Sequence, residues 1–361
     1  MFAKFLRRIR WHYVDVVARL GIGDEEILRQ GRRPAYGKAQ PRLLTVTQGA
    51  EPFSAHDALH GSWSTPEQSP AIPNSLWVEI DGAAECIRYY PSGLRDSDNR
   101  VALVFLSGDV VLRTPLGIRY TGPTYARQTP DHLTGLMAEW SADAGAAAIY
   151  LARPGIFGSS GDHEKRRLPY EIDLMDRSLD LLKEKHRIGR FILVGQSGGA
   201  QIAAALLNRR RDITASVMTS GLLSVHQTVS RWRRFRPVPG GAVHPVEALC
   251  DPMQDISRIP RRPAPTIILI SDPRDAAVPL HSQLQYLRKL VAEGLKPHHI
   301  YAHAQGPKRH NLGLHGRKAA ALIARGADIR QIRQALVDLD LDNLGESRKS
   351  AKPIRAAAAE D

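Results

Sequence analysis

The residues Phe191-Ile192-Leu193-Val194-Gly195-Gln196-Ser197-Gly198-Gly199-Ala200 decide how we interpret this chain. The apolar run predicts a buried strand, and the small apolar residues that continue to Leu207 predict a helix directly after it. A serine on so sharp a turn would be exposed, and its neighbours two residues before and after, Gly195 and Gly199, would lie too close to the chain for a Cβ. The start of the helix would present the backbone N–H of Gly198 to an anion forming at Ser197. The alternative is an ordinary glycine-rich turn with an incidental serine.

At 361 residues, 43% of them hydrophobic, the chain is long enough for one large α/β domain with additions or for two small domains. Its two cysteines, Cys86 and Cys250, form neither a disulfide framework nor a metal-ligand spacing, which favours a reducing compartment. No run reaches the roughly 18 apolar residues of a membrane span, and the first residues lack the apolar stretch of a secretory signal. We therefore expect a cytoplasmic protein.

The net charge is +13, from 50 lysines and arginines against 37 acidic residues. The arginines are scattered, neither a helix-turn-helix nor a zinc-finger spacing occurs, and aromatic residues make up only 6%. These observations argue against nucleic acid as a partner. They leave a generally basic surface, an anionic lipid surface or an acidic substrate.

Residues 1–75 are expected to form an N-terminal extension. Residues 1–20 show apolar side chains at helical spacing with basic ones between, so they predict an amphipathic helix that docks on the core, on a partner or on an anionic membrane surface. Residues 31–75 are rich in Pro, Gly, Ser and Gln and predict an irregular segment. Within it His56 and His60 have a zinc-like spacing, which we reject because the general-base Glu is absent and flanking Pro and Gly should break the helix.

Residues 76–325 alternate short apolar runs with helical patterns. Such alternation predicts a mostly parallel sheet covered by helices on both faces. The expected strands are residues 76–80, 85–90, 101–106, 146–151, 191–194, 213–219, 266–270 and 299–303, and the expected helices are residues 131–144 with Asp131 as cap, 168–186, 280–295 and 314–324.

The pattern is interrupted at residues 222–264, which predict a short cap over the carboxyl edge of the sheet. The core is accordingly expected in residues 76–221 and 265–325. Residues 326–361 predict one more helix and a flexible tail, because they end in a polar, alanine-rich stretch.

Two later segments supply candidate partners for the serine. Asp275 follows the expected strand 266–270 and precedes Val278-Pro279, and His310 follows the expected strand 299–303. In the order Ser, Asp, His, with each residue after a strand, the chain resembles the α/β-hydrolase superfamily. The resemblance implies that Asp275 orients His310 and that His310 takes the proton of Ser197. Asp272 is a rival acid, and His303 and His315 are rival bases.

The resemblance also implies a second oxyanion donor after the strand 101–106. Here the sequence departs from the family, because Ser107-Gly108-Asp109 stands where His-Gly is usual. The backbone N–H of Gly108 or Asp109 can still serve, provided that the Asp109 carboxylate points away or pairs with a base such as Arg113. The Gly- and Ser-rich residues 153–163 resemble the loop that borders the site in this family.

The sequence thus predicts a serine hydrolase of the esterase, dienelactone-hydrolase or prolyl-peptidase-like branch, acting on a carboxylic ester or related small acyl compound without metal or cofactor. An ester is favoured over a peptide. Basic residues of the expected cap, with Arg233 and Arg234 foremost, suggest that the substrate is anionic. The alternative is a non-catalytic protein of the same fold that binds a partner or a membrane surface. The oligomeric state is left open.

Overall fold

The computed structural model of the protein describes residues 33–35, 39–96, 98–113, 119–235, 244–306 and 308–350. The amphipathic helix expected in residues 1–20 lies outside this part of the chain. No helix in the described ranges is long and apolar enough to cross a membrane.

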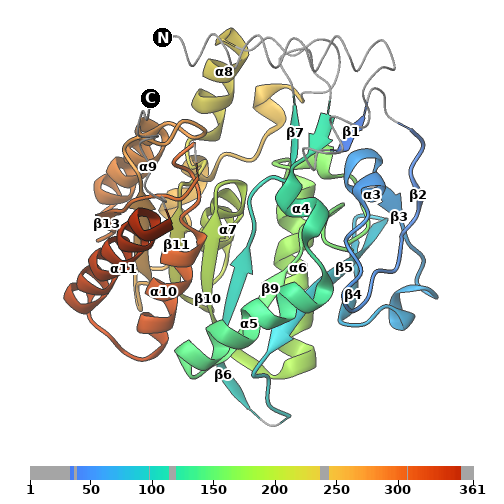
Figure 1. The fold of residues 1–361 in the computed structure, drawn as a ribbon, viewed down its shortest axis with the longest axis horizontal. Helices are drawn as coiled ribbons and strands as arrows, with labels where there is room; N and C mark the ends of the chain where they lie inside the picture. The colour runs from blue at the N-terminus through green and yellow to red at the C-terminus, as the bar shows by residue number, and fades with distance from the viewer. Residues whose placement is uncertain are drawn as a thin grey trace, which may run out of the picture.

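An eight-stranded sheet forms the centre of the molecule (Figure 1). Its order is β4-β5-β9-β6-β10-β11-β12-β13, and the strands from β9 to β13 run parallel to one another while β4 and β5 are antiparallel to their neighbours. The bounds are Ser75–Ile80, Ala83–Ser92, Ala147–Leu151, Asn99–Leu106, Ile188–Gln196, Ile213–Thr219, Thr266–Ser271 and His298–Tyr301 in that order. The prediction of a mostly parallel sheet is confirmed.

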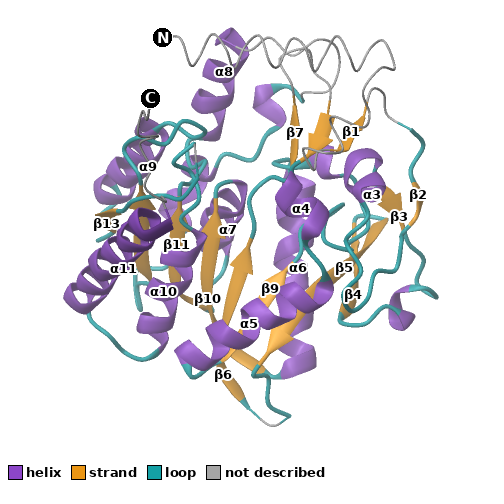
Figure 2. Ribbon diagram, viewed as in Figure 1, coloured by secondary structure: helices purple, strands orange, loops and turns teal. Residues whose placement is uncertain are grey.

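The central strands are apolar on both faces because helices cover both sides. On β6, Ala102, Val104 and Leu106 belong to one core cluster, and Leu103 and Phe105 belong to the other. The first cluster packs against α6 (Pro169–His186), α7 (Gly198–Arg209) and α9 (Leu280–Ala292). The second packs against α5 (Pro130–Ala144), α10 (Gly313–Ala324) and α11 (Ile329–Ser350), which lie in front of the sheet in Figures 1 and 2.

The N-terminal extension is more regular than its composition suggested. Short strands β2 (Arg42–Leu43) and β3 (Ser62–Trp63) pair in parallel, and β1 (Arg33–Ala35), β8 (Arg119–Thr121) and β7 (Val111–Arg113) form a second small sheet. Two further short elements are the 3₁₀ helix η1 (Ser69–Ala71) and the helix α4 (Pro123–Arg127).

One helix, α3 (Ala55–His60), corrects our reasoning about the two histidines. Ser54 caps it by accepting from the backbone N–H of Asp57, so the flanking Pro and Gly delimit the helix and do not break it. The rings of His56 and His60 lie 4.6 Å apart, and His60 Nδ1 accepts from the backbone N–H of Ala39. Among the described residues no three His, Cys, Asp or Glu side chains gather as metal ligands.

The start of α5 is a second correction, because Thr129 and not Asp131 is its cap. The Thr129 hydroxyl accepts from the backbone N–H of His132, and Pro130 occupies the first helical position. Asp131 lies within the first turn, where a carboxylate still favours the helix dipole.

The expected cap region begins with α8 (Val225–Phe235), which projects past the carboxyl ends of the parallel strands (Figure 1). Its residues Val225 and Val229 pack with Val278 of the loop that carries Asp275. The rest of the region contains η3 (Val246–Ala248) and η4 (Pro252–Arg258). This part packs against α7, where Asn208 Nδ2 donates to the carbonyl oxygen of Pro252 at 2.8 Å.

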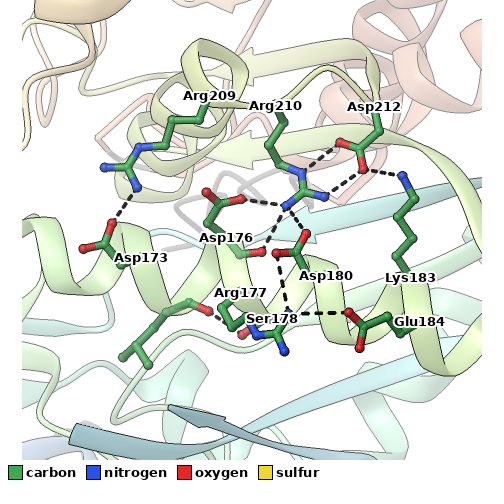
Figure 3. A network of polar contacts seen from close by, with 11 residues as sticks. Asp173, Asp176, Arg177, Ser178, Asp180, Lys183, Glu184, Arg209, Arg210 and Asp212 are labelled. Atoms are coloured by element: carbon green, nitrogen blue, oxygen red, sulfur yellow. Dashed lines mark hydrogen bonds and ion pairs between the residues drawn. The ribbon is translucent and has the colours of Figure 1, made fainter. Parts of the chain in front are cut away.

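An ion-pair network joins α6 to the α7–β11 connection (Figure 3). Arg210 lies at its centre and donates to Asp176, Asp180 and Asp212 at 2.7–2.8 Å. Lys183 also donates to Asp212, at 2.8 Å. Burial by itself would raise the pKa of Asp212, but its bonds to Arg210 and Lys183 hold that pKa below its usual value.

Candidate active site

Ser197 lies on a strained turn between β10 and α7. Its φ and ψ are 57° and −113°, a conformation that a residue with a side chain rarely adopts. A Cβ on Gly195 would lie 2.4 Å from the carbonyl oxygen of Gly199, and a Cβ on Gly199 would lie 2.0 Å from that of Leu106. Both glycines are therefore required by the close approach of the backbone, as the sequence predicted.

Asp275 and His310 form a hydrogen-bonded pair. His310 Nδ1 lies 2.7 Å from Asp275 Oδ2, and the Asp275 side chain is fully buried while His310 is 23% exposed. The other carboxylate oxygen of Asp275 accepts from the backbone N–H groups of Ala277 and Val278. With Nδ1 donating to the carboxylate, His310 Nε2 is the ring nitrogen that can accept a proton.

The rival acid and bases have other partners. Asp272 is buried and accepts from the backbone N–H groups of Arg274 and Ala304. His303 contacts Arg274, with Nδ1 2.7 Å from Nη2. His315 is buried against Asp340 of α11, at 2.8 Å. These contacts hold the C-terminal helix and the loop after β13 in place.

Gln196 ties the serine turn to the histidine loop, a role that sequence reasoning missed. Its Nε2 donates to the carbonyl oxygen of His310 at 2.8 Å, and its Oε1 accepts from the backbone N–H of Leu312 at 3.1 Å. The Thr219 hydroxyl also donates to this oxygen, at 2.6 Å. The side chain is nearly buried, so these bonds are shielded from water. The variable position of a G-x-S-x-G pattern gives no signal for such a bond.

The candidate oxyanion donors lie beside Ser197. Gly198 is the first residue of α7. A Cβ on Gly108 would lie 3.1 Å from Ser197 Cβ and 3.7 Å from its Oγ, so this loop passes next to the serine. A Cβ on Gly198 would lie 2.5 Å from Asp109 Oδ1, so the Asp109 carboxylate also lies next to the start of α7.

Three arginines compensate the charge of Asp109. Arg153 Nη1 lies 2.9 Å from Asp109 Oδ1, Arg166 Nε lies 3.3 Å from Oδ2, and Arg167 donates to the same oxygen. Burial would raise the pKa of this carboxyl, but Arg167, Arg166 and Arg153 hold that pKa well below its usual value. The side chain of Arg113, the partner that the sequence suggested, lies outside the described residues.

Arg153 also fixes the shape of the oxyanion loop. It is fully buried, donates to the carbonyl oxygen of Ser107 at 3.2 Å, and pairs with Glu171 of α6 at 2.8 Å. Glu171 in turn accepts from the backbone N–H of Arg167 at 2.6 Å. No spacing in the sequence links residues 107–109 to residues 153, 166 and 171, so this network could not be predicted.

The strand order and the site together identify the fold. The central sheet begins with an antiparallel pair, followed by six parallel strands in which β6 and β9, the third and fourth of its strands along the chain, have exchanged positions. Ser197 follows β10, Asp275 follows β12 and His310 follows β13. The chain has the α/β-hydrolase fold. The serine turn in it follows the fifth strand of the central sheet.

No family model matches this α/β-hydrolase-fold chain, and no curated protein sequence matches it either. Among solved structures it is similar to the Pyrococcus furiosus esterase Pf2001, with 14% identity over 81% of this chain and 97% of that one and a TM-score of 0.48. It is also similar to Est1E from Butyrivibrio proteoclasticus with ferulic acid bound, with 11% identity over 73% and 98% and a TM-score of 0.48.

A third similar structure is the Pyrococcus horikoshii acylaminoacyl peptidase, with 15% identity over 72% of this chain and a TM-score of 0.46. The chain spans 43% of that protein and 36% of another acylaminoacyl peptidase. The strand order, and not these likenesses, identifies the fold.

The cap arginines are only partly described. Arg233 is half-buried and donates to the carbonyl oxygen of His244. The Arg234 side chain lies outside the described residues.

Proposed function

We propose that the protein is a serine hydrolase that cleaves a carboxylic ester or related acyl compound through an acyl-enzyme intermediate. The observation that carries this proposal is the strained Ser197, joined through Gln196 to the loop of a hydrogen-bonded His310–Asp275 pair. Strain of this kind is maintained where it serves a mechanism.

In the first half-reaction His310 Nε2 takes the proton of the Ser197 hydroxyl while Oγ attacks the carbonyl carbon of the substrate. The negative charge that develops on the carbonyl oxygen is stabilised by the backbone N–H of Gly198 and by that of Gly108 or Asp109. Asp275 stabilises the imidazolium without taking its proton. The imidazolium then protonates the leaving alkoxide, and an acyl group remains on Ser197.

In the second half-reaction water replaces the alcohol. His310 takes a proton from this water, the hydroxide attacks the acyl carbonyl carbon, and the bond to Ser197 Oγ breaks. The proton returns to Oγ, so the enzyme is restored and one acid and one alcohol are released. An ester is the least demanding substrate, since an alkoxide leaves with less help from a general acid than an amide nitrogen, which must be protonated first.

The two cysteines support the inference of a cytoplasmic protein. Cys86 is buried, Cys250 is half-buried, and both are free thiols. Fractionation of the producing cells tests this location, and recovery outside the cytoplasm would contradict it.

The catalytic proposal is tested by replacing the nucleophile. In Ser197→Ala we expect 4-nitrophenyl acetate turnover to fall on the order of 10⁵-fold and fluorophosphonate labelling to disappear, because only oxyanion and binding effects remain. Ser178→Ala is the matched control, since it removes a buried serine hydroxyl whose bond lies within α6. Labelling that persists in Ser197→Ala would assign the nucleophile elsewhere, and a parent chain without labelling or turnover would favour the non-catalytic alternative.

A further inference from the structure

A half-buried arginine without an acidic partner among the described residues lies on α10, which begins three residues after His310. Arg317 forms no ion pair within 4.0 Å and no side-chain hydrogen bond with the residues that the structure describes. Its guanidinium lies over the ring of Phe105, with Cζ 5.5 Å from the ring centroid. Its backbone carbonyl accepts from Trp140 Nε1 at 2.8 Å, which fixes α10 against α5.

The surroundings of this guanidinium are mostly apolar. The Phe105 ring lies 5.4 Å from that of Tyr150 and 6.5 Å from that of Trp140, as measured between centroids. Burial lowers the pKa of Arg317, while Tyr150 and Glu139 oppose this effect. A cation withdrawn from water without a counter-ion is costly, so an arginine in this condition is a candidate for binding an anion.

The position of Arg317 relates it to the reaction centre. A Cβ on Gly313 would lie 3.4 Å from Asn311 Oδ1, 3.6 Å from Phe105 Cζ and 3.8 Å from Arg317 Nη1. Gly313 comes three residues after His310 and directly after Leu312, which donates to Gln196. Gly313 therefore lies between the guanidinium and Asn311, the residue that follows the proposed base.

Several other basic side chains near the site are already paired, although Arg309, directly before His310, forms no ion pair with the described residues either. Arg153, Arg166 and Arg167 surround Asp109, and Arg233 donates to the His244 carbonyl. On α10 itself, Lys318 lies within 3.4 Å of both carboxylate oxygens of Asp143. Arg317 thus combines a place beside Gly313, at the end of the histidine loop, with an unoccupied hydrogen-bonding capacity.

We propose that Arg317 binds a carboxylate of the substrate, so that the enzyme prefers acyl compounds that carry a second, ionised carboxyl group. This inference rests on the proposed hydrolase function and names the substrate class for the same site. The planar guanidinium would form two parallel hydrogen bonds with the carboxylate, and the ring of Phe105 would hold it in place.

The test compares two esters that differ in charge. We expect the ratio of kcat/KM for 4-nitrophenyl hemisuccinate to that for 4-nitrophenyl butyrate to fall about tenfold or more in Arg317→Gln. Lys318→Gln is the matched control, because it removes the same charge from the next residue of α10, and there the ratio should equal that of the parent. Arg317→Lys keeps the charge without the planar guanidinium and should give an intermediate ratio. This variant also tests the inference if Arg317→Gln does not fold.

A third ester, 4-acetoxybenzoate, carries the carboxylate on the leaving group. If Arg317→Gln lowers kcat/KM for 4-acetoxybenzoate but leaves that for 4-nitrophenyl hemisuccinate unchanged, the subsite lies on the alcohol side. That result would contradict our assignment to the acyl side. Equal ratios in the parent, Arg317→Gln and Lys318→Gln would overturn the inference while leaving the hydrolase proposal intact.

A binding measurement separates this inference from the hydrolase proposal. Calorimetric titration with glutarate needs no turnover, and we expect the parent and Lys318→Gln to bind it with equal affinity and Arg317→Gln about tenfold or more weakly. Binding that is the same in all three proteins, or absent from the parent, would overturn the inference whether or not the enzyme hydrolyses esters.

Discussion

Gln196 shows how a single side chain can position the base without touching the substrate. It holds the His310 carbonyl and the Leu312 N–H with one amide, so it ties the turn of the proposed nucleophile to the loop of the proposed base. Such a bond places Oγ and the imidazole relative to each other, and small errors in that placement are costly in rate.

We therefore predict that Gln196→Leu lowers kcat about 10- to 100-fold with little change in KM. Gln196→Glu keeps the acceptor for Leu312 and loses the donor for His310, so it should give an intermediate rate. The fluorophosphonate labelling rate should follow kcat in both variants.

Gln201→Leu is the control for Gln196, because Gln201 is also buried and donates through Nε2 to a backbone carbonyl, that of Cys250 at 2.7 Å. It should lower the unfolding temperature without lowering kcat. If Gln196→Leu loses stability alone and keeps the parent kcat, then Gln196 has no positioning role.

The residues of the site differ in how far sequence could reveal them. Ser197, Asp275 and His310 each follow a predicted strand, and strand ends meet at one edge of a parallel sheet, so local patterns were sufficient to select them as candidates. Gln196 and Arg153 act through contacts to segments 114 and 46 residues away. Their partners depend on how the loops are folded, and no local pattern contains that information.

Among the elements, α6 is joined by ion pairs to the end of α7 and to the α7–β11 connection. Figure 3 shows Asp173, Asp176 and Asp180 of α6 facing Arg209 and Arg210, with Asp212 and Lys183 closing the network. Arg210 is largely buried, so its bonds to Asp176, Asp180 and Asp212 are less screened than those of an exposed pair.

We predict that Arg210→Met lowers the free energy of unfolding on the order of 2 kcal/mol at neutral pH, because three carboxylates lose a charged donor. Asp212 has a lowered pKa, so its contribution is present above its unfolded pKa and is lost as the pH falls through its folded pKa. The difference between parent and variant should therefore shrink below about pH 4. Chemical denaturation of both proteins at a series of pH values measures this difference in unfolding free energy.

Arg258→Met is the control, because Arg258 pairs with Asp255 in an exposed position and should cost less than about 1 kcal/mol at any pH. A difference for Arg210→Met that is equally small, or that grows as the pH falls, would show that the network does not stabilise the connection between α6 and β11.

Element boundaries were predicted least well where side chains decide them. Thr129 replaced Asp131 as the cap of α5, and β13 ends at Tyr301, two residues before the expected end. The short helix α3 exists because Ser54 and Gly61 delimit it and because Asp57 pairs with Arg42 at 2.9 Å. In each case the local sequence permits more than one boundary, and contacts with the rest of the fold decide between them.

At the scale of the whole molecule, the net charge of +13 acts on a substrate before any contact forms. Long-range attraction changes the rate of encounter and is weakened by salt, whereas the contact at Arg317 is short-range and partly shielded. The two effects can therefore be separated by ionic strength. The same field would attract an anionic surface, so it does not by itself indicate a substrate.

Our last prediction uses this difference. Raising the ionic strength from about 0.02 M to about 0.3 M should lower kcat/KM for 4-nitrophenyl hemisuccinate several-fold and leave that for 4-nitrophenyl butyrate unchanged. Arg317→Gln should lower the rate with the anionic ester at every salt concentration while keeping the same dependence on salt, because the field comes from many charges.

In Arg233→Gln the low-salt rate should fall by no more than about twofold, since Arg233 is one of these charges and already donates to the His244 carbonyl. A salt dependence that disappears in Arg233→Gln would instead make the cap arginine the principal source of attraction, and a rate with the anionic ester that is independent of salt in the parent would exclude steering by the molecule's charge.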